Sequence, residues 1–345
     1  MKKKSKVIIL TVLLSGVFLL IIVGGVVYLK IKSSAFNIDK TTYIYVDEKK
    51  DYSNLLSQLK STAYIKNINL FKQLASFLKY PENVKIGRYE ITPKTTYLEA
   101  VQMLRNGQQT PVKLTFNNIR LKKDFAEVIG KQLMFNSDIL LNRLNDPGVT
   151  ASFGFDTITI MTMFIPNTYQ IYWNISADKF MEKMKKEYDR FWSGKRLAKA
   201  KAISLSPIEV SILASIVEEE TLSKQEFPIV AGLYLNRLKK RMLLQADPTV
   251  KFAVGDFTLK RILNQHLQVE SPYNTYKNQG LPPGPIRLPS IAVIDGVLNY
   301  KEHSYIYMCA KDDFSGAHNF AVTLNEHNRN AQKYRAALNR NHIIR

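Results

Sequence analysis

An uncharged apolar run near the N-terminus constrains this chain more than any other feature. The run extends from Val7 to Tyr28, which is long enough for one helix to cross the hydrocarbon core of a bilayer. Lysines occupy positions 2, 3, 4 and 6, and basic residues that flank a span tend to stay in the cytoplasm. We therefore expect residues 1–6 to form a cytoplasmic tail, residues 7–28 a transmembrane helix, and the remainder to lie outside the inner (plasma) membrane.

A cleaved signal peptide is the alternative interpretation of this segment. Lys30 and Lys32 weaken the charge asymmetry across the run, and Ser33-Ser34-Ala35 offers a small-residue cleavage site. That site is a poor one, and the apolar run is longer than the core of a usual signal peptide. The length of the run favours a retained, single-pass anchor.

The chain is basic and long enough for about two domains. It has 345 residues, with 49 Lys and Arg against 29 Asp and Glu, and a formal net charge of +20. Such a surface favours anionic partners, namely nucleic acid, acidic lipid headgroups or anionic wall polymers. A domain outside the membrane would not meet nucleic acid, so we discard that partner. One cysteine and five histidines without an H-E-x-x-H motif predict no metal site and no other cofactor.

Residues 40–117 show alternating strand and helix patterns, which predict a small α+β module. One expected strand contains Gly87-x-Tyr89, and the helix after it ends in Arg105-Asn106-Gly107. These features are similar to those of LysM modules, which bind glycan strands, while a structural spacer is an equally good alternative. The expected strands are 41–46, 84–91 and 111–116, and the expected helices are 52–59, 67–78 and 96–105.

The sequence pattern of residues 118–345 predicts a larger α+β domain, in which one expected helix is distinctive. Ser206 is a good N-cap, and Glu209 completes a capping box around Pro207 at the first helical position. Apolar residues then cover nearly the whole circumference, which is typical of a buried helix. The helix nevertheless ends in three consecutive glutamates, 218 to 220. Burial at a helix C-terminus raises the pKa of a carboxyl, and a general acid needs a raised pKa.

Helical spacing separates these three glutamates. Glu218 lies over a strip of small side chains, whereas Glu219 and Glu220 lie over larger apolar ones. Small neighbours leave room for a substrate, so the spacing predicts that Glu218 is the catalytic acid. The alternative is that all three glutamates form a solvated helix end.

Polar residues on predicted loops follow this helix. Gln245 and Asp247 precede Pro248, which favours a turn. Tyr273-Asn274-Thr275-Tyr276 lies close to a rigid run of prolines and glycines at 280–286, and an aromatic ring beside an amide is a common combination for binding sugars. His318 lies in a further loop, 316–320. Taken singly, each feature could be purely structural.

Together these motifs resemble the YceG-like (MltG-type) family of endolytic murein transglycosylases. The resemblance extends over about residues 40–335, is strongest from 205 to 330, and includes the N-terminal anchor. Met161, Asn167 and Ala246 depart from the family pattern, since the first two stand where carboxylates are usual. The matching motifs are Ala214–Glu218 with Glu220-Thr221, Leu235–Leu238, Leu244–Thr249 except Ala246, Tyr273–Tyr276, Gly280–Ile286 and Gly316–Phe320.

The resemblance implies a reaction and a set of site residues. The reaction is a non-hydrolytic cut between N-acetylmuramic acid and N-acetylglucosamine in peptidoglycan glycan strands, and it leaves a 1,6-anhydro end. The family pattern identifies Glu218, the first acidic residue after Ala-Ser-Ile-Val, as the acid that donates one proton and later accepts another. Peptidoglycan synthases are candidate partners. The residues expected to line the glycan groove are Gln245, Asp247, Tyr273, Asn274 and His318.

Two other functions remain open on the sequence alone. A glycoside hydrolase would use Asp247 or Glu219 as a second carboxylate on the same substrate. A non-catalytic scaffold would bind the wall through the LysM-like module and would hold the synthesis machinery at the membrane. The products separate the first two activities, because a hydrolase leaves reducing ends.

Overall fold

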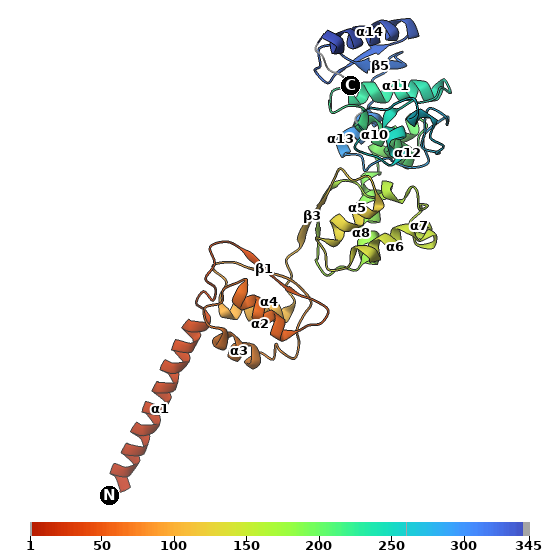
Figure 1. Cartoon of the computed structure of the whole chain (residues 1–345). Coiled ribbons are helices and arrows are strands. Elements are labelled where there is room, and N and C mark those ends of the chain that lie inside the picture. Colours follow the sequence, from red (N-terminus) through yellow and green to blue (C-terminus); the bar gives the residue numbers. More distant parts are fainter. Residues whose placement is uncertain (1, 260, 341–345) are drawn as a thin grey trace. The chain divides into compact units, whose positions relative to one another are not determined.

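The computed structural model of this chain describes residues 2–259 and 261–340, which form helices and short strands (Figure 1). The chain divides into two compact units. The first comprises the residues up to Lys113 together with Gln170–Ile175, and the second comprises Leu114–Tyr169 and the residues from Ser176 on. The α+β class is confirmed at this level, because the chain combines many helices with two-stranded sheets.

The N-terminal helix α1 (Lys2–Ile31) contains the predicted membrane span. Its segment Leu10–Ile31 has a mean hydropathy of 2.7, and the rest of the protein buries none of it. A helix that is apolar on every side and unburied is suited to lipid rather than to water. This helix is compatible with a single-pass membrane protein, and it continues to Ile31, beyond the predicted end at residue 28.

The rest of the first unit is a small module built on an antiparallel strand pair. Strand β1 (Thr42–Val46) pairs with β2 (Gly87–Ile91), and Thr42 lies opposite Ile91. Every second residue of β2 is buried, so one face of the pair points into a core. The helices α2 (Tyr52–Ser61), α3 (Ile68–Phe77) and α4 (Tyr97–Asn106) complete the module.

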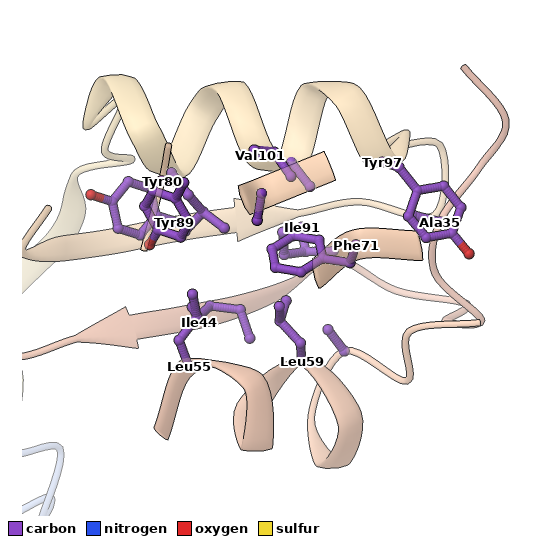
Figure 2. Close-up of a cluster of buried hydrophobic side chains, with 14 of the residues drawn as sticks. Ala35, Ile44, Leu55, Leu59, Phe71, Tyr80, Tyr89, Ile91, Tyr97 and Val101 are labelled. Atoms are coloured by element: carbon purple, nitrogen blue, oxygen red, sulfur yellow. The ribbon is translucent and has the colours of Figure 1, made fainter. Parts of the chain in front are cut away.

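The core of this module is continuous and holds several aromatic rings. Figure 2 shows side chains from both strands meeting side chains from the helices. Local sequence signals begin and end these helices, because Thr96 and Glu99 form a capping box on α4 and Gly107 ends it with a left-handed φ of 70°. Core residues labelled in the figure are Ala35, Ile44, Leu55, Leu59, Phe71, Tyr80, Tyr89, Ile91, Tyr97 and Val101.

The third expected strand of the module does not join its sheet. Strand β3 (Val112–Phe116) pairs instead with β4 (Asn167–Ile171), and the division between the two units falls within both strands. The alternation of residues in a strand does not reveal which other strand it pairs with, because pairing depends on the tertiary fold.

The first half of the second unit packs around aromatic residues. Phe125 contacts Phe116, Phe164 and Phe180, with ring centroids between 4.4 and 6.4 Å apart. Two helices lie between residues 120 and 145, and Asp146 caps a third, short one. The elements are α5 (Lys122–Gly130), α6 (Ser137–Asn145), α7 (Pro147–Ser152), the 3-10 helix η1 (Ile160–Met163), α8 (Ala177–Phe191) and α9 (Lys195–Ala202).

The second half of this unit is arranged around α10 (Pro207–Glu220). The predicted capping box of Ser206 and Glu209 is present, and the residues from Val210 to Val217 are all buried. Figure 1 shows α10 among α11, α12 and α13, which pack against it, while β5 and α14 lie together. The elements are α11 (Phe227–Lys239), α12 (Asp247–Val254), the 3-10 helix η2 (His266–Gln268), α13 (Ile291–Leu298), β5 (Tyr307–Ala310), β6 (His318–Ala321) and α14 (Leu324–Arg340).

Candidate active site

The three glutamates at the end of α10 face different surroundings. Glu218 accepts a hydrogen bond from the backbone N–H of Ser290, 3.0 Å from its Oε2, and Arg287 Nε lies 3.5 Å from the same oxygen. Ser290 is the N-cap of α13, and its own side chain makes no capping bond. The Glu218 carboxylate therefore takes the place of a capping side chain at the start of α13.

Glu219 belongs to the same cluster of charged groups. Its Oε1 lies 2.6 Å from Arg120 and 2.7 Å from Arg287, and its side chain is only 15% exposed. Arg287 also donates to the side-chain oxygen of Asn118. This arginine network, made by Glu218, Glu219, Arg120 and Arg287, joins the segments around 118–120 and 287–290 to α10.

Glu220 lies in a different environment, beside a cleft with a volume of about 470 Å³. The phenol of the buried Tyr234 on α11 donates a hydrogen bond to Glu220 Oε1 at 2.5 Å. Burial raises the pKa of Glu220 to about 7; the Tyr234 hydrogen bond opposes this rise, and the nearby charge of Asp247 adds to it. Glu220 is thus a carboxyl that holds its proton close to neutral pH.

The cleft is enclosed by two groups of elements. Helices α10 and α11 and the start of α12 supply Glu220, Tyr234 and Asp247, whereas β5, β6 and α14 supply a tyrosine, two histidines and several apolar side chains. The lining residues are Glu220, Leu233, Tyr234, Arg237, Gln245, Asp247, Tyr276, Tyr307, Met308, Cys309, Ala310, His318, Leu324 and His327.

Asp247 is held in the cleft by the phenol of Tyr276. The phenol donates a hydrogen bond to Asp247 Oδ1 at 2.6 Å, and burial together with this bond raises the pKa of Tyr276. Gln245 adopts a left-handed backbone with a φ of 48°, and its N–H donates to the carbonyl of Thr275. Uncommon backbone angles in non-glycine residues tend to occur at functional sites, and this one brings both predicted residues to the cleft.

Two other predicted groove residues lie outside the lining of this cleft. Asn274 is completely buried, its amide donates to the carbonyls of Leu267 and Val269, and its oxygen accepts from the N–H of Tyr276. The Tyr273 ring packs against Phe252. Their contact with a glycan remains a prediction, while the structure shows that Asn274 supports the loop that carries Tyr276.

His318 is the predicted residue on the opposite side of the cleft, at the start of β6. Its Nδ1 lies 2.9 Å from Glu226 Oε2, and its backbone N–H donates to Oε1 of the same carboxylate. The structure therefore brings Gln245, Asp247 and His318 to one cleft with Glu220, whereas it places Glu218 in the arginine network.

The Asn236-Arg237 motif on α11 holds the β5 side of the cleft in place. The Asn236 amide donates to the carbonyls of His303 and Tyr305, and Arg237 Nε donates to the carbonyl of Ile306. Arg237 NH1 also donates to the carbonyl of Leu244. These bonds satisfy backbone groups at the strand and at the loop ahead of α12, so the two walls of the cleft share one support.

The chain matches a known protein family. The sequence model of the YceG-like family matches residues 44–333, which is most of the chain. The chain belongs to the YceG-like family. A solved structure of a putative YceG-like protein from Listeria monocytogenes is 25% identical in sequence, aligns with a TM-score of 0.52, and covers 84% of this chain and 99% of its own.

Two curated relatives of this YceG-like protein carry a functional name. The endolytic murein transglycosylase of Bacillus subtilis (strain 168) is 42% identical over 127 residues, which are 37% of this chain and 34% of that protein. The endolytic murein transglycosylase of Streptococcus pneumoniae serotype 2 is 29% identical over 173 residues, or 49% of this chain and 31% of that protein. The matched segments thus span about a third of the length of these relatives.

Several cleft residues of the YceG-like protein were not predicted from its sequence. Glu220 and Tyr276 lie in motifs that the sequence did single out and Tyr234 directly precedes one, but nothing in their spacing shows that they meet. Glu226 lies outside every motif. Among the residues that the structure describes, no group of three or more His, Cys, Asp or Glu side chains is arranged to hold a metal ion.

Proposed function

We propose that this YceG-like protein is a membrane-anchored endolytic murein transglycosylase with Glu220 as its general acid. The observation that carries the proposal is a carboxyl with a pKa of about 7 in a cleft that also holds Asp247, Gln245 and His318. A group with this pKa is partly protonated at neutral pH and can also accept a proton. The names of the matched relatives supply the substrate class, the murein glycan.

The proposed reaction uses one carboxyl twice. Protonated Glu220 donates its proton to the oxygen between N-acetylmuramic acid and N-acetylglucosamine, and the bond from this oxygen to C1 breaks. The resulting carboxylate takes the proton of the muramic 6-hydroxyl, whose oxygen bonds to C1 and closes the 1,6-anhydro ring. Water is not consumed, and Glu220 regains its proton.

Glu218, the acid predicted from helical spacing and from the family pattern, is the alternative proton donor. Both glutamates lie at the C-terminal end of α10, but of the two it is Glu220 that lines the cleft. Glu218 is bound by the N-terminus of α13 through Oε2.

Product analysis with two matched variants tests this proposal. Full-length protein in detergent micelles would be incubated with purified glycan strands, and the products would be identified by mass spectrometry. We expect 1,6-anhydro ends from the wild type and from Glu218→Gln, and none from Glu220→Gln. Activity lost only in Glu218→Gln would reverse the assignment, and no cleavage by the wild type would favour the scaffold.

A hydrolase is the second candidate, because Asp247 lies in the same cleft as Glu220 and could act as the second carboxylate. The same experiment separates the two reactions. A hydrolase would release reducing ends, which are heavier than anhydro ends by one water molecule.

We further propose that the module of the first unit is LysM-like and holds the glycan. Its compact order of strand, helix, helix, strand and helix supports this proposal. Binding of the full-length protein to insoluble peptidoglycan tests this proposal. Substitutions in the module should reduce the amount of protein that stays bound. Peptidoglycan synthases remain candidate partners.

The proposed topology places the N-terminus in the cytoplasm and the catalytic domain outside the plasma (inner) membrane. The basic residues ahead of α1 support this orientation. Cys309, the one cysteine of the chain, provides a probe. A membrane-impermeant maleimide should label Cys309 in intact spheroplasts, and labelling that requires lysis would contradict the topology.

A further inference from the structure

Glu226 is a buried carboxylate whose hydrogen bonds reach the end of α10 and the start of β6. It precedes α11 and is 8% exposed. Oε1 accepts the backbone N–H of His318 at 2.8 Å, and Oε2 lies 2.9 Å from both His318 Nδ1 and Thr221 Oγ1. A buried carboxylate is costly unless such bonds compensate it.

The protonation state of Glu226 follows from these contacts. Burial by itself would raise its pKa, but the hydrogen bonds from His318 and Thr221 outweigh burial and lower the pKa. The carboxylate is therefore ionised at neutral pH and can only accept hydrogen bonds. Nδ1 of His318 must consequently be the donor, both in the neutral ring and in the protonated ring.

This constraint decides what His318 offers to the cleft. With the proton on Nδ1, the neutral ring carries its lone pair on Nε2. Within the described part of the chain, Nδ1 is the ring nitrogen of His318 that has a hydrogen bond to protein. Its Nε2 is not among the buried side-chain atoms that lack a hydrogen-bond partner. Because His318 lines the cleft, Nε2 is the atom available to a ligand.

The same carboxylate also holds the residue that follows Glu220. Thr221 ends α10, and its hydroxyl donates to Glu226 while accepting the N–H of Ser223. The N–H of Glu226 in turn donates to the carbonyl of Ser223. These bonds close the turn between α10 and α11, so one side chain links the end of the helix that bears Glu220 to the strand that bears His318.

We propose that Glu226 is a positioning residue that holds His318 as the Nδ1–H tautomer, with Nε2 accepting a hydrogen bond from a glycan hydroxyl beside Glu220. The proposal rests on the proposed function for the identity of the ligand. Its structural part, the tautomer and its dependence on Glu226, can be tested without any activity.

The first test is a spectroscopic one. Full-length protein with ¹⁵N-labelled histidine in detergent micelles would be compared with His318→Gln, which identifies the His318 signals. We expect the wild-type ring to show Nδ1–H and an unprotonated Nε2 at alkaline pH, and Glu226→Gln to shift it towards the Nε2–H form. An Nε2–H wild-type ring, or an unchanged tautomer in Glu226→Gln, would overturn the proposal even if glycan cleavage were confirmed.

The second test measures whether the two residues act as a unit. Glu226→Gln and His318→Gln should each lower the rate of glycan cleavage by about tenfold or more, and the double variant should be little slower than either, because interacting neighbours are not additive. Glu187→Gln on α8, which removes a partly exposed carboxylate from its ion pairs with Lys183 and Arg190, is the control and should keep the wild-type rate. Additive losses would mean that Glu226 does not act through His318.

A further variant guards against simple misfolding. Thr221→Val removes the other hydrogen bond to Oε2 but leaves the bond from His318 Nδ1. It should keep the Nδ1–H signal of the wild type, whereas Glu226→Gln should lose it at a temperature where both proteins are folded by circular dichroism. Equal loss in both variants would assign Glu226 a structural role alone and would contradict the proposal.

Discussion

The two sides of the α10 C-terminus carry chemically identical carboxylates in opposite environments. On one side, Glu218 and Glu219 meet arginines and a helix N-terminus, at distances of 2.6 to 3.5 Å. On the other side, Glu220 is buried beside the cleft, binds the Tyr234 phenol and lies near the charge of Asp247. Cationic partners suit a carboxylate that links segments of the chain, whereas burial with a raised pKa suits the general acid that we propose, so the neighbours distinguish the glutamates.

Removing each carboxylate in turn is the sharpest way to test this difference. Glu220→Gln should lower the rate of anhydro-end formation by about 10²- to 10⁴-fold, the usual contribution of a general acid. Glu218→Gln keeps the cleft intact and should lower it by less than about tenfold. Rates would be measured at matched protein concentrations with folded variants. Equal losses would erase the distinction between the two sides.

The pH dependence of stability should differ between the wild type and Glu220→Gln. The pKa of Glu220 rises from 4.5 to about 7 on folding, so between these values the unfolded chain releases a proton that the folded chain retains. The free energy of unfolding therefore falls as pH rises through this window, by at most about 3 kcal/mol, and the loss persists above pH 7.

Denaturant titrations of both proteins at pH 4 and pH 8 would measure this effect. Contributions from other groups are shared, so the difference between the two proteins isolates Glu220. The variant should gain stability relative to the wild type at the higher pH. A difference that is the same at both values would show that Glu220 is not enclosed as described.

Breaking the arginine network should affect stability more than chemistry. Arg287→Met leaves Glu218 without its cation and Glu219 with Arg120 alone, and should lower the free energy of unfolding by about 1–3 kcal/mol. Arg190→Met, which removes a largely exposed cation from its pair with Glu187, should change it by less than about 1 kcal/mol. The pH profile of cleavage should keep its shape in Arg287→Met, and a displaced profile would count against a purely structural network.

The smallest expected effect concerns the phenol that binds Glu220. The hydrogen bond from Tyr234 lowers the pKa of Glu220, so Tyr234→Phe should raise it. The alkaline limb of the pH–rate profile should then move to higher pH, while the rate at the optimum should change by less than about tenfold. Tyr305→Phe, which keeps a ring outside the cleft lining, is the matched control. An alkaline limb that does not move would show that Tyr234 does not affect the pKa of the general acid.

Local signals in the sequence predicted the elements of the site well. The capping box of Ser206 and Glu209 and the apolar circumference of α10 were visible without the fold, and the structure confirms both. Gln245 and Asp247 were both expected on a loop; Gln245 precedes α12 and Asp247 is its first residue, and both line the cleft. Capping and burial patterns are properties of neighbouring residues in the chain, so they can be read from the sequence directly.

Helical spacing could not show what fills the space beside each glutamate. The strip of small residues beneath Glu218 does leave room, as predicted, but a segment of this chain occupies it. Ser215 Oγ accepts a hydrogen bond from the backbone N–H of Ile286 at 3.1 Å, and the Glu218 carboxylate accepts one from the backbone N–H of Ser290. Spacing identifies the faces of a helix, whereas the groups that occupy the Glu218 face come from segments 71 and 72 residues away in the chain.

The amino-acid sequence alone reveals the apolar anchor, the buried helix that ends in three acids, and the motifs that resemble the YceG-like family. Each depends on composition or on neighbours within a few turns. The tertiary fold is needed to show that Tyr234, Asp247 and His318 line one cleft with Glu220 while Arg287 meets Glu218. The pKa of a carboxyl depends on burial and on charges within a few ångströms, and those neighbours come together only when distant segments pack.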